Sequence, residues 1–112
     1  MSGGVDSSVA AALLVEQGFD VTGVMLHLWA EKENRCCAPQ AVEDARRVAE
    51  QLGIGFFLVD YEAEFKASVV DHFVAEYSQG RTPNPCLACN RQIRFGHLLR
   101  HVRGMGAEMM AT

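Results

Sequence analysis

Residues 2–8, Ser-Gly-Gly-Val-Asp-Ser-Ser, place glycines, hydroxyls and a carboxylate immediately before an apolar helical pattern. Gly3 and Gly4 allow the backbone to approach a ligand closely, and the first N–H groups of a helix are unpaired anion ligands. The hydroxyls add donors, and Asp6 can orient the loop or hold Mg²⁺. The pattern is neither a G-x-x-x-x-G-K-[ST] loop nor a G-x-G-x-x-G fingerprint. It predicts a phosphate site, with a helix cap that binds no ligand as the alternative.

The four cysteines form a second group that can do chemistry. Cys36 and Cys37 are adjacent, whereas Cys86 and Cys89 are separated by two residues. No secretory signal is visible, so we expect reduced thiols in a cytoplasmic protein rather than a disulfide framework. The sequence predicts that Cys89 opens a helix, a position that favours the nucleophilic thiolate. A structural zinc half-site at Cys86 and Cys89 is the alternative, and it needs two more ligands.

The charge of the chain is unevenly distributed. The formal net charge is −4, yet residues 81–112 contain five arginines and a single acidic residue, Glu108. A basic segment on an acidic domain is typical of a face that contacts phosphates. The alternative is a solvated helix face that happens to use arginine.

Helices and strands alternate along the sequence. Apolar spacing predicts helices over residues 5–17, 39–52, 62–77 and 89–102, and strands over 21–29 and 54–59, with residues 108–112 able to form a final strand. In the third helix Phe65, Val69, Phe73 and Tyr77 share one stripe. This alternation predicts an α/β fold, a parallel sheet with flanking helices. Such a fold begins with a strand, so we expect that the first strand is missing here.

The composition is that of one compact domain. Hydrophobic residues make up 49% and charged residues 21% of the 112 residues, which excludes a disordered chain. Apolar runs are far shorter than the roughly 20 residues that cross a bilayer, so no membrane association is expected.

Two motifs resemble a known family. Ser-Gly-Gly-x-Asp-Ser at a helix start is similar to the PP-loop of enzymes that split ATP into AMP and pyrophosphate. Residues 82–90, Thr-Pro-Asn-Pro-Cys-Leu-Ala-Cys-Asn, look like the corresponding stretch of the tRNA-specific 2-thiouridylases, the MnmA type. The resemblance covers essentially the whole chain, because residues 36–37, 44–46, 52–54 and 95–96 also match in the right order.

The resemblance implies a fold, a reaction and its participants. The fold is that of an adenine nucleotide alpha hydrolase-like PP-loop ATPase. ATP, with Mg²⁺, adenylates the C2 oxygen of the wobble uridine of tRNA, and a persulfide then supplies sulfur to give 2-thiouridine, AMP and pyrophosphate. A cysteine desulfurase or a sulfur-relay protein is the expected persulfide donor.

The same resemblance assigns roles to residues of this sequence. It implies that Cys89 is the catalytic nucleophile, which forms a disulfide with the persulfide-carrying cysteine. It implies that Asn84, Pro85 and Cys86 contact the target base, although many relatives carry Asp where Cys86 stands. An iron–sulfur cluster held by Cys86, Cys89 and a later cysteine is a variant. The residues implied in ATP binding are Met1, Ser2, Gly3, Gly4, Val5, Asp6, Ser7 and, through its backbone, Leu26.

The resemblance also predicts that residues 1–112 are part of an N-terminal catalytic domain. The persulfide-carrying cysteine of the family lies well downstream of the C-x-x-C motif, so we expect this chain alone not to complete thiolation. Two other functions remain open at this point. One is a different PP-loop adenylating enzyme, such as an amidotransferase-type synthetase, which has no need of Cys89. The other is a nucleotide- or metal-binding module without enzymatic activity.

Overall fold

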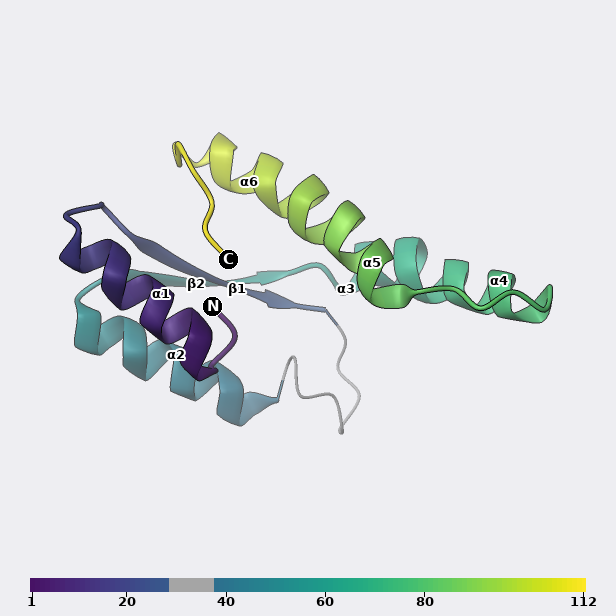
Figure 1. Ribbon diagram of the computed structural model, residues 1–112, viewed down its shortest axis with the longest axis horizontal. Coiled ribbons are helices and arrows are strands. Elements are labelled where there is room, and N and C mark those ends of the chain that lie inside the picture. The colour runs from purple at the N-terminus through teal and green to yellow at the C-terminus, as the bar shows by residue number, and fades with distance from the viewer. Residues whose placement is uncertain (29–37) are drawn as a thin grey trace. The chain divides into compact units, whose positions relative to one another are not determined.

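A computed structural model describes residues 1–28 and 38–112 of the chain (Figure 1). The described residues form two compact units. The first comprises Met1–Asp60 together with Ala111–Thr112, and the second comprises Tyr61–Met110. Cys36 and Cys37 fall outside the described residues.

The first unit is built from two parallel strands and two helices. Its elements are α1 (Val5–Glu16), β1 (Thr22–His27), α2 (Pro39–Leu52) and β2 (Gly55–Asp60). The strands pair in register from Thr22 opposite Gly55 to His27 opposite Asp60. The helix α2 contacts both strands and α1 packs against α2 (Figure 1). The predicted parallel sheet with flanking helices is confirmed.

The sequence explains where α2 begins and ends, and what it buries. Pro39 occupies the first helical turn, where its missing N–H costs nothing, and Gly53 ends the helix with a left-handed φ of 67°. Ala45 and Ala49 are fully buried on its inner face. Small side chains at these positions allow the helix to lie close to the strands, where Met25 of β1 is also buried.

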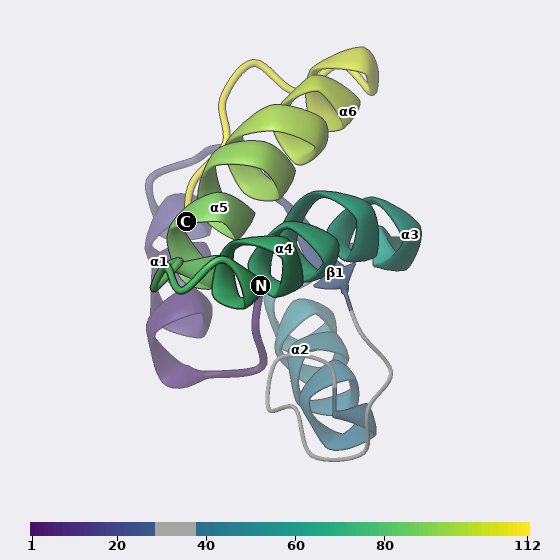
Figure 2. The ribbon, with the colours of Figure 1, turned by 90° about the vertical axis from the view of Figure 1, so that its right-hand side faces the viewer.

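The second unit contains two helical stretches, each interrupted by π-helical winding. The first consists of α3 (Glu62–Phe65), the π segment η1 (Lys66–Val70) and α4 (Asp71–Ser78); the second consists of α5 (Pro85–Cys89), the π segment η2 (Asn90–Leu98) and α6 (Leu99–Gly104). The segment η1 contacts α5, so the two stretches pack together near the start of the second (Figure 2). Val69, Ile93, Leu98 and Val102 are buried.

Two expectations about these elements are wrong, the start of the last helix and the final strand. The last helical stretch begins at Pro85 rather than at Cys89, because a proline fits the first turn and Asn84 caps it. Residues 108–112 form no strand, because no hydrogen-bond ladder pairs them with another segment of the described chain. Phe73 and Tyr77 continue the predicted stripe but are exposed, with Tyr77 70% accessible.

None of the helices within residues 1–28 and 38–112 combines the length and apolar character needed to cross a bilayer.

Candidate active site

The segment before α1 is organised by its serine hydroxyls. The backbone N–H of Ser2 donates to Ser7 Oγ at 3.2 Å, and the Ser2 and Ser7 hydroxyls lie 3.1 Å apart. Ser2 Oγ also accepts from the Gly4 N–H at 3.3 Å, while Ser7 Oγ donates to the Gly4 carbonyl. These bonds close residues 2–7 into a compact loop at the N-terminus of α1.

Gly3 makes this loop possible. Its φ of +76° lies in the left-handed region that residues with a side chain rarely adopt. A Cβ at this position would also lie 2.4 Å from the carbonyl oxygen of Ala41 in α2. The loop therefore passes α2 at a distance that only glycine permits.

The loop presents open donors at the end of the helix. Gly4 is the N-cap residue of α1, and the Ser8 N–H donates to the Gly4 carbonyl at 3.3 Å. The N–H groups of Val5, Asp6 and Ser7 precede that first helical bond and have no acceptor within the described residues. Three open N–H groups at the positive end of a helix macrodipole form an anion site. The exposed Asp6 is the acidic residue of this first turn.

Two other residues predicted to bind ATP are associated with β1, which Met1 contacts and to which Leu26 belongs. The Met1 ammonium group donates to the Val24 carbonyl, and the Met1 side chain lies where a Cβ of Gly23 would be. Leu26 is half-buried and stands opposite Val59 in the strand register. Met1 is thus fixed beside the sheet at the start of the loop, while Leu26 lies near the carboxyl end of β1.

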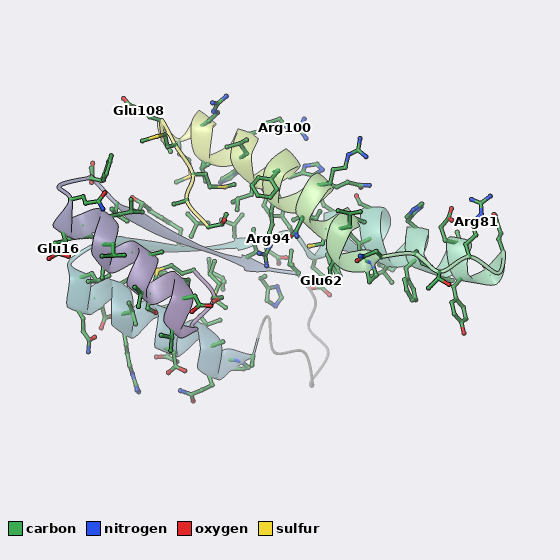
Figure 3. All side chains as sticks on the ribbon, viewed as in Figure 1. Glu16, Glu62, Arg81, Arg94, Arg100 and Glu108 are labelled. Atoms are coloured by element: carbon green, nitrogen blue, oxygen red, sulfur yellow. The ribbon has the colours of Figure 1, made fainter. Side chains whose placement is uncertain are left out.

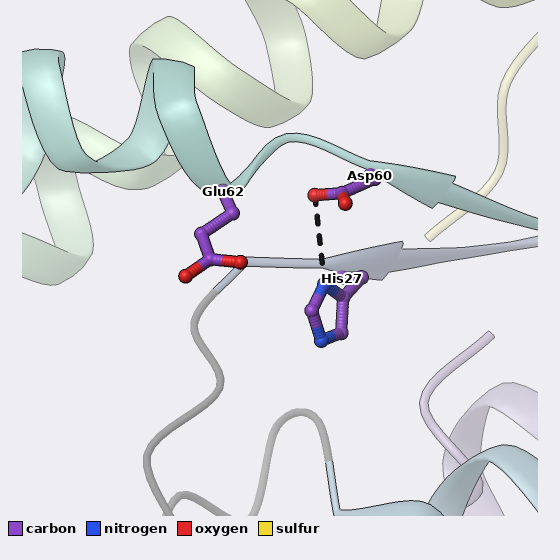
Figure 4. A group of neighbouring side chains, drawn as sticks. All are labelled: His27, Asp60 and Glu62. Atoms are coloured by element: carbon purple, nitrogen blue, oxygen red, sulfur yellow. Dashed lines mark hydrogen bonds and ion pairs between the residues drawn. The ribbon is translucent and has the colours of Figure 1, made fainter.

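At that carboxyl end a histidine and a carboxylate meet. His27 Nδ1 lies 3.5 Å from Asp60 Oδ1, and the two residues are directly opposite in the parallel register (Figure 4). Ligands of open α/β sheets bind beyond the carboxyl ends of the strands. The sequence alone favoured an ordinary core or surface role for His27, because only the strand register reveals its neighbour.

The Pro-Asn-Pro turn forms the start of the second helical stretch. The Asn84 side chain accepts a hydrogen bond from the Leu87 N–H at 3.2 Å, and Pro85 takes the first helical position. Cys86 therefore lies in the first turn and is exposed, while Cys89 lies one turn further on and is half-buried. Both are present as thiols. Asn84, Pro85, Cys86 and Cys89 therefore lie at the capped start of one helical stretch, within its first two turns.

The Asn84 cap leads to a testable prediction for stability. An Asn84→Ala substitution removes the acceptor for the Leu87 N–H and is expected to lower the free energy of unfolding by about 1 kcal/mol. Urea denaturation followed by circular dichroism measures this loss. Asn90→Ala, at an exposed helical position, is the matched control and should not lower the stability. Equal losses in the two variants would contradict the capping role.

Arginines surround this turn. Arg81 lies in the loop after α4 and pairs with Glu76, at 3.2 Å from Arg81 Nη1 to Glu76 Oε2. Arg94 and Arg100 come from the second helical stretch and point to different sides of it (Figure 3). The predicted basic segment is therefore exposed but is spread around the helix rather than gathered on one face.

His97 and His101, four residues apart, pack around one tyrosine. The Tyr61 ring lies 6.0 Å from the His97 ring and 6.3 Å from the His101 ring, and its hydroxyl donates to the His97 carbonyl at 3.4 Å. Burial, followed by the nearby Glu64 carboxylate, raises the pKa of Tyr61, and Arg100 acts in the opposite direction. The phenol is therefore held protonated as a donor, and the two histidines have a packing role.

A parallel strand pair flanked by helices, with unpaired N–H groups at the start of the first helix, defines a domain of the α/β class. The chain belongs to the tRNA methyl transferase HUP domain family, which it matches over residues 1–112. The resemblance deduced from the sequence is thereby confirmed.

Individual relatives are similar over the entire chain. The chain is 53% identical over 118 aligned positions to the tRNA-specific 2-thiouridylase MnmA of Clostridium perfringens, covering 100% of this chain and 33% of that protein. It is 53% identical to the protein of the same name from Roseiflexus castenholzii and 52% identical to that from a Bradyrhizobium species, covering 32% and 30% of them. The chain thus spans about a third of the length of the curated relatives it matches.

Proposed function

We propose that this chain forms the ATP-activating and thiol-bearing part of a tRNA 2-thiouridylase that acts in the cytoplasm. The observation that carries the proposal is the full-chain similarity to relatives named as tRNA-specific 2-thiouridylases. The organised anion loop at α1 and the two thiols of the capped turn at Asn84 support it independently.

In the first step the chain activates uridine. The C2 oxygen of the wobble uridine attacks the α-phosphorus of ATP, the bond to the β-phosphate oxygen breaks, and pyrophosphate leaves. The open N–H groups of Val5, Asp6 and Ser7 hold the departing phosphates. Because these donors are fixed by the loop before the reaction, they stabilise the negative charge without reorganisation. Met1, Ser2, Gly3, Gly4 and Leu26 complete the proposed ATP site.

The second step transfers sulfur. The terminal sulfur of a persulfide, delivered by a cysteine desulfurase or a sulfur-relay protein, attacks C2 of the adenylated uridine, and AMP leaves with the former C2 oxygen. The Cys89 thiolate then attacks the inner sulfur of the carrier and forms a disulfide with it. The S–S bond to the base breaks, and its electron pair remains on the sulfur of 2-thiouridine. Asn84, Pro85 and Cys86 hold the base during this exchange.

The residues of the loop fit a magnesium ion. The Asp6 carboxylate is exposed beside the anion site and has no partner within the described residues, and Mg²⁺ is usually held by one or two carboxylates and substrate phosphates. Asp6 would hold the ion, which neutralises phosphate charge when bound.

The described residues contain two of the cysteine ligands that an iron–sulfur cluster requires. Cys86 and Cys89 offer two thiolates, whereas protein-bound clusters of this kind take four cysteine ligands. The thiol exchange at Cys89 accounts for the product without a cluster, so no step is assigned to one.

A Ser7→Ala substitution tests the phosphate site. Ser7 Oγ bonds to Ser2, and its removal is expected to weaken ATP and pyrophosphate binding roughly 10- to 100-fold, the value of a hydrogen bond to a charged group. Isothermal titration calorimetry of the chain with Mg·ATP and with pyrophosphate measures the change.

Ser8→Ala is the matched control for this experiment. The Ser8 hydroxyl donates to the Gly4 carbonyl at 2.8 Å, outside the bonds between Ser2 and Ser7, so its loss should leave affinity near that of the unsubstituted chain. If Ser7→Ala binds pyrophosphate as tightly as Ser8→Ala does, residues 2–7 are not the phosphate site.

A further inference from the structure

The second unit contains a pocket that is lined by Asn84 and Pro85 and, beyond them, by residues to which the proposed reaction gives no role. It has a volume of about 360 Å³ and lies between α4 and the start of the second helical stretch. Phe73 and His72 line it from α4, and Asn84, Arg91 and Gln92 line it from the other side. Its size is within the range of small-ligand pockets, roughly 300–1,000 Å³.

One wall of the pocket is an exposed aromatic surface. The Phe73 ring stacks on that of Tyr77, with centroids 6.1 Å apart and an interplanar angle of 11°. Phe73 itself is 36% exposed, and Tyr77, which lies outside the pocket lining, is 70% exposed. The apolar stripe that is buried at Val69 therefore emerges at Phe73 as an accessible π-face.

The opposite wall contains polar side chains that are available to bind a ligand. The exposed side chains of Arg91 and Gln92 have no hydrogen bond or ion pair within the described part of the chain. The Asn84 oxygen is occupied by the Leu87 N–H, which leaves its amide NH₂ group as a donor. The one carboxylate on the pocket wall, Glu76, is paired with Arg81.

We propose that this pocket holds an unpaired nucleobase of the tRNA loop next to the uridine that is modified. The base stacks on Phe73, the amide of Gln92 contacts its edge, and Arg91 contacts the adjoining phosphate. An aromatic face beside an unpaired guanidinium is the combination with which proteins bind single-stranded RNA. The excess of arginine over acidic residues in residues 81–112 complements the phosphate backbone. The choice of RNA as the ligand rests on the proposed function.

A Phe73→Ala substitution tests the stacking. The probe is a seven-nucleotide single-stranded RNA that contains 2-aminopurine, whose fluorescence falls when the base stacks. The unsubstituted chain is expected to quench the probe, and Phe73→Ala is expected to bind it roughly 5- to 100-fold more weakly with the quench lost. Val74 is exposed on the same helix but lies outside the pocket lining, so Val74→Ala is the matched control. This control should neither weaken binding of the probe nor abolish the quenching. Phe73→Trp should restore the quench.

The Arg91 contact is tested separately by salt. Arg91→Gln is expected to weaken RNA binding and to reduce the slope of log affinity against log salt by about one. Arg103→Gln, exposed on the same helical stretch outside the pocket lining, should leave that slope unchanged. Circular dichroism of each variant checks that the helices are retained.

The outcomes separate this proposal from the proposed function. If Phe73→Ala binds and quenches the RNA probe like the unsubstituted chain, or if the unsubstituted chain does not bind the probe, the pocket proposal is wrong. Thiolation that depends on Cys89 then still supports the proposed function. If the probe binds through Phe73, but a protein of the relatives' full length that contains this chain makes no 2-thiouridine, the pocket stands and the proposed function fails.

Discussion

Replacing Cys89 by serine is expected to lower 2-thiouridine formation by roughly a thousandfold or more, in a protein of the relatives' full length that contains this chain. A serine hydroxyl cannot form the disulfide that releases the carrier from the base. ATP–pyrophosphate exchange in the presence of tRNA should persist, because adenylation precedes the thiol step. Mass spectrometry of nucleosides measures the product, and exchange of labelled pyrophosphate measures the first step.

The expected block has a chemical signature. Without Cys89 the base remains joined to the carrier through C2–S–S, so dithiothreitol should release 2-thiouridine from the stalled complex by attacking the inner sulfur. A general loss of folding would not respond to the reductant. If Cys89→Ser makes 2-thiouridine at the normal rate, Cys89 is not the nucleophile. Normal exchange without thiolation, before and after the substitution, would instead favour another adenylating enzyme such as an amidotransferase-type synthetase.

A Gly3→Ala substitution is the second change for which a large effect is expected. The new Cβ would lie 2.4 Å from the Ala41 carbonyl oxygen, and the φ of +76° is unfavourable for alanine by about 1–2 kcal/mol. The loop must move away from α2, which breaks the hydrogen bonds between Ser2 and Ser7. We expect a loss of more than about 2 kcal/mol in stability and a loss of measurable ATP binding.

Gly18→Ala separates the two causes. Gly18 has a φ of +87°, and a Cβ there would meet nothing within 4 Å. The control therefore carries the backbone strain of Gly3→Ala without the collision, and should retain ATP binding. Urea denaturation and calorimetric titration with Mg·ATP compare the two variants. Equal stability losses, together with normal ATP binding by Gly3→Ala, would show that the loop tolerates a side chain.

The first unit is predictable from sequence because its signals are local. Pro39 and Gly53 mark the ends of α2, and two short apolar runs mark the strands. The predicted ends of these helices and strands therefore lie within two residues of the observed ones. The anion loop was also predictable, since glycine and serine before a helix suffice to propose it. The meeting of His27 and Asp60 was not, because it depends on the register between strands more than thirty residues apart.

The second unit is less predictable because a proline can either interrupt a helix or occupy its first turn. Pro83 and Pro85 suggest a break, yet Pro85 opens a helix once Asn84 caps it, so Cys89 lies a full turn later than expected. The apolar spacing also placed Val69 and Phe73 on one stripe of the third helix. The spacing of apolar residues indicates which side chains share a helix face, whereas their burial depends on tertiary packing. After Val69 the side chains of this face are exposed.

The π-helical segment η2 changes the winding of the chain after Cys89. Each of its turns takes one more residue than an α turn, so an α-helical wheel drawn from the sequence misplaces every side chain downstream. Gly96 lies inside the segment, where a Cβ would be 3.3 Å from the Arg91 carbonyl oxygen. Because each residue of an α-helix turns the chain by about 100°, deleting one residue here is expected to rotate the end of the helix relative to Cys89. In this segment a change in length therefore acts as a rotation, which reorients Arg100 and Arg103 without altering either residue.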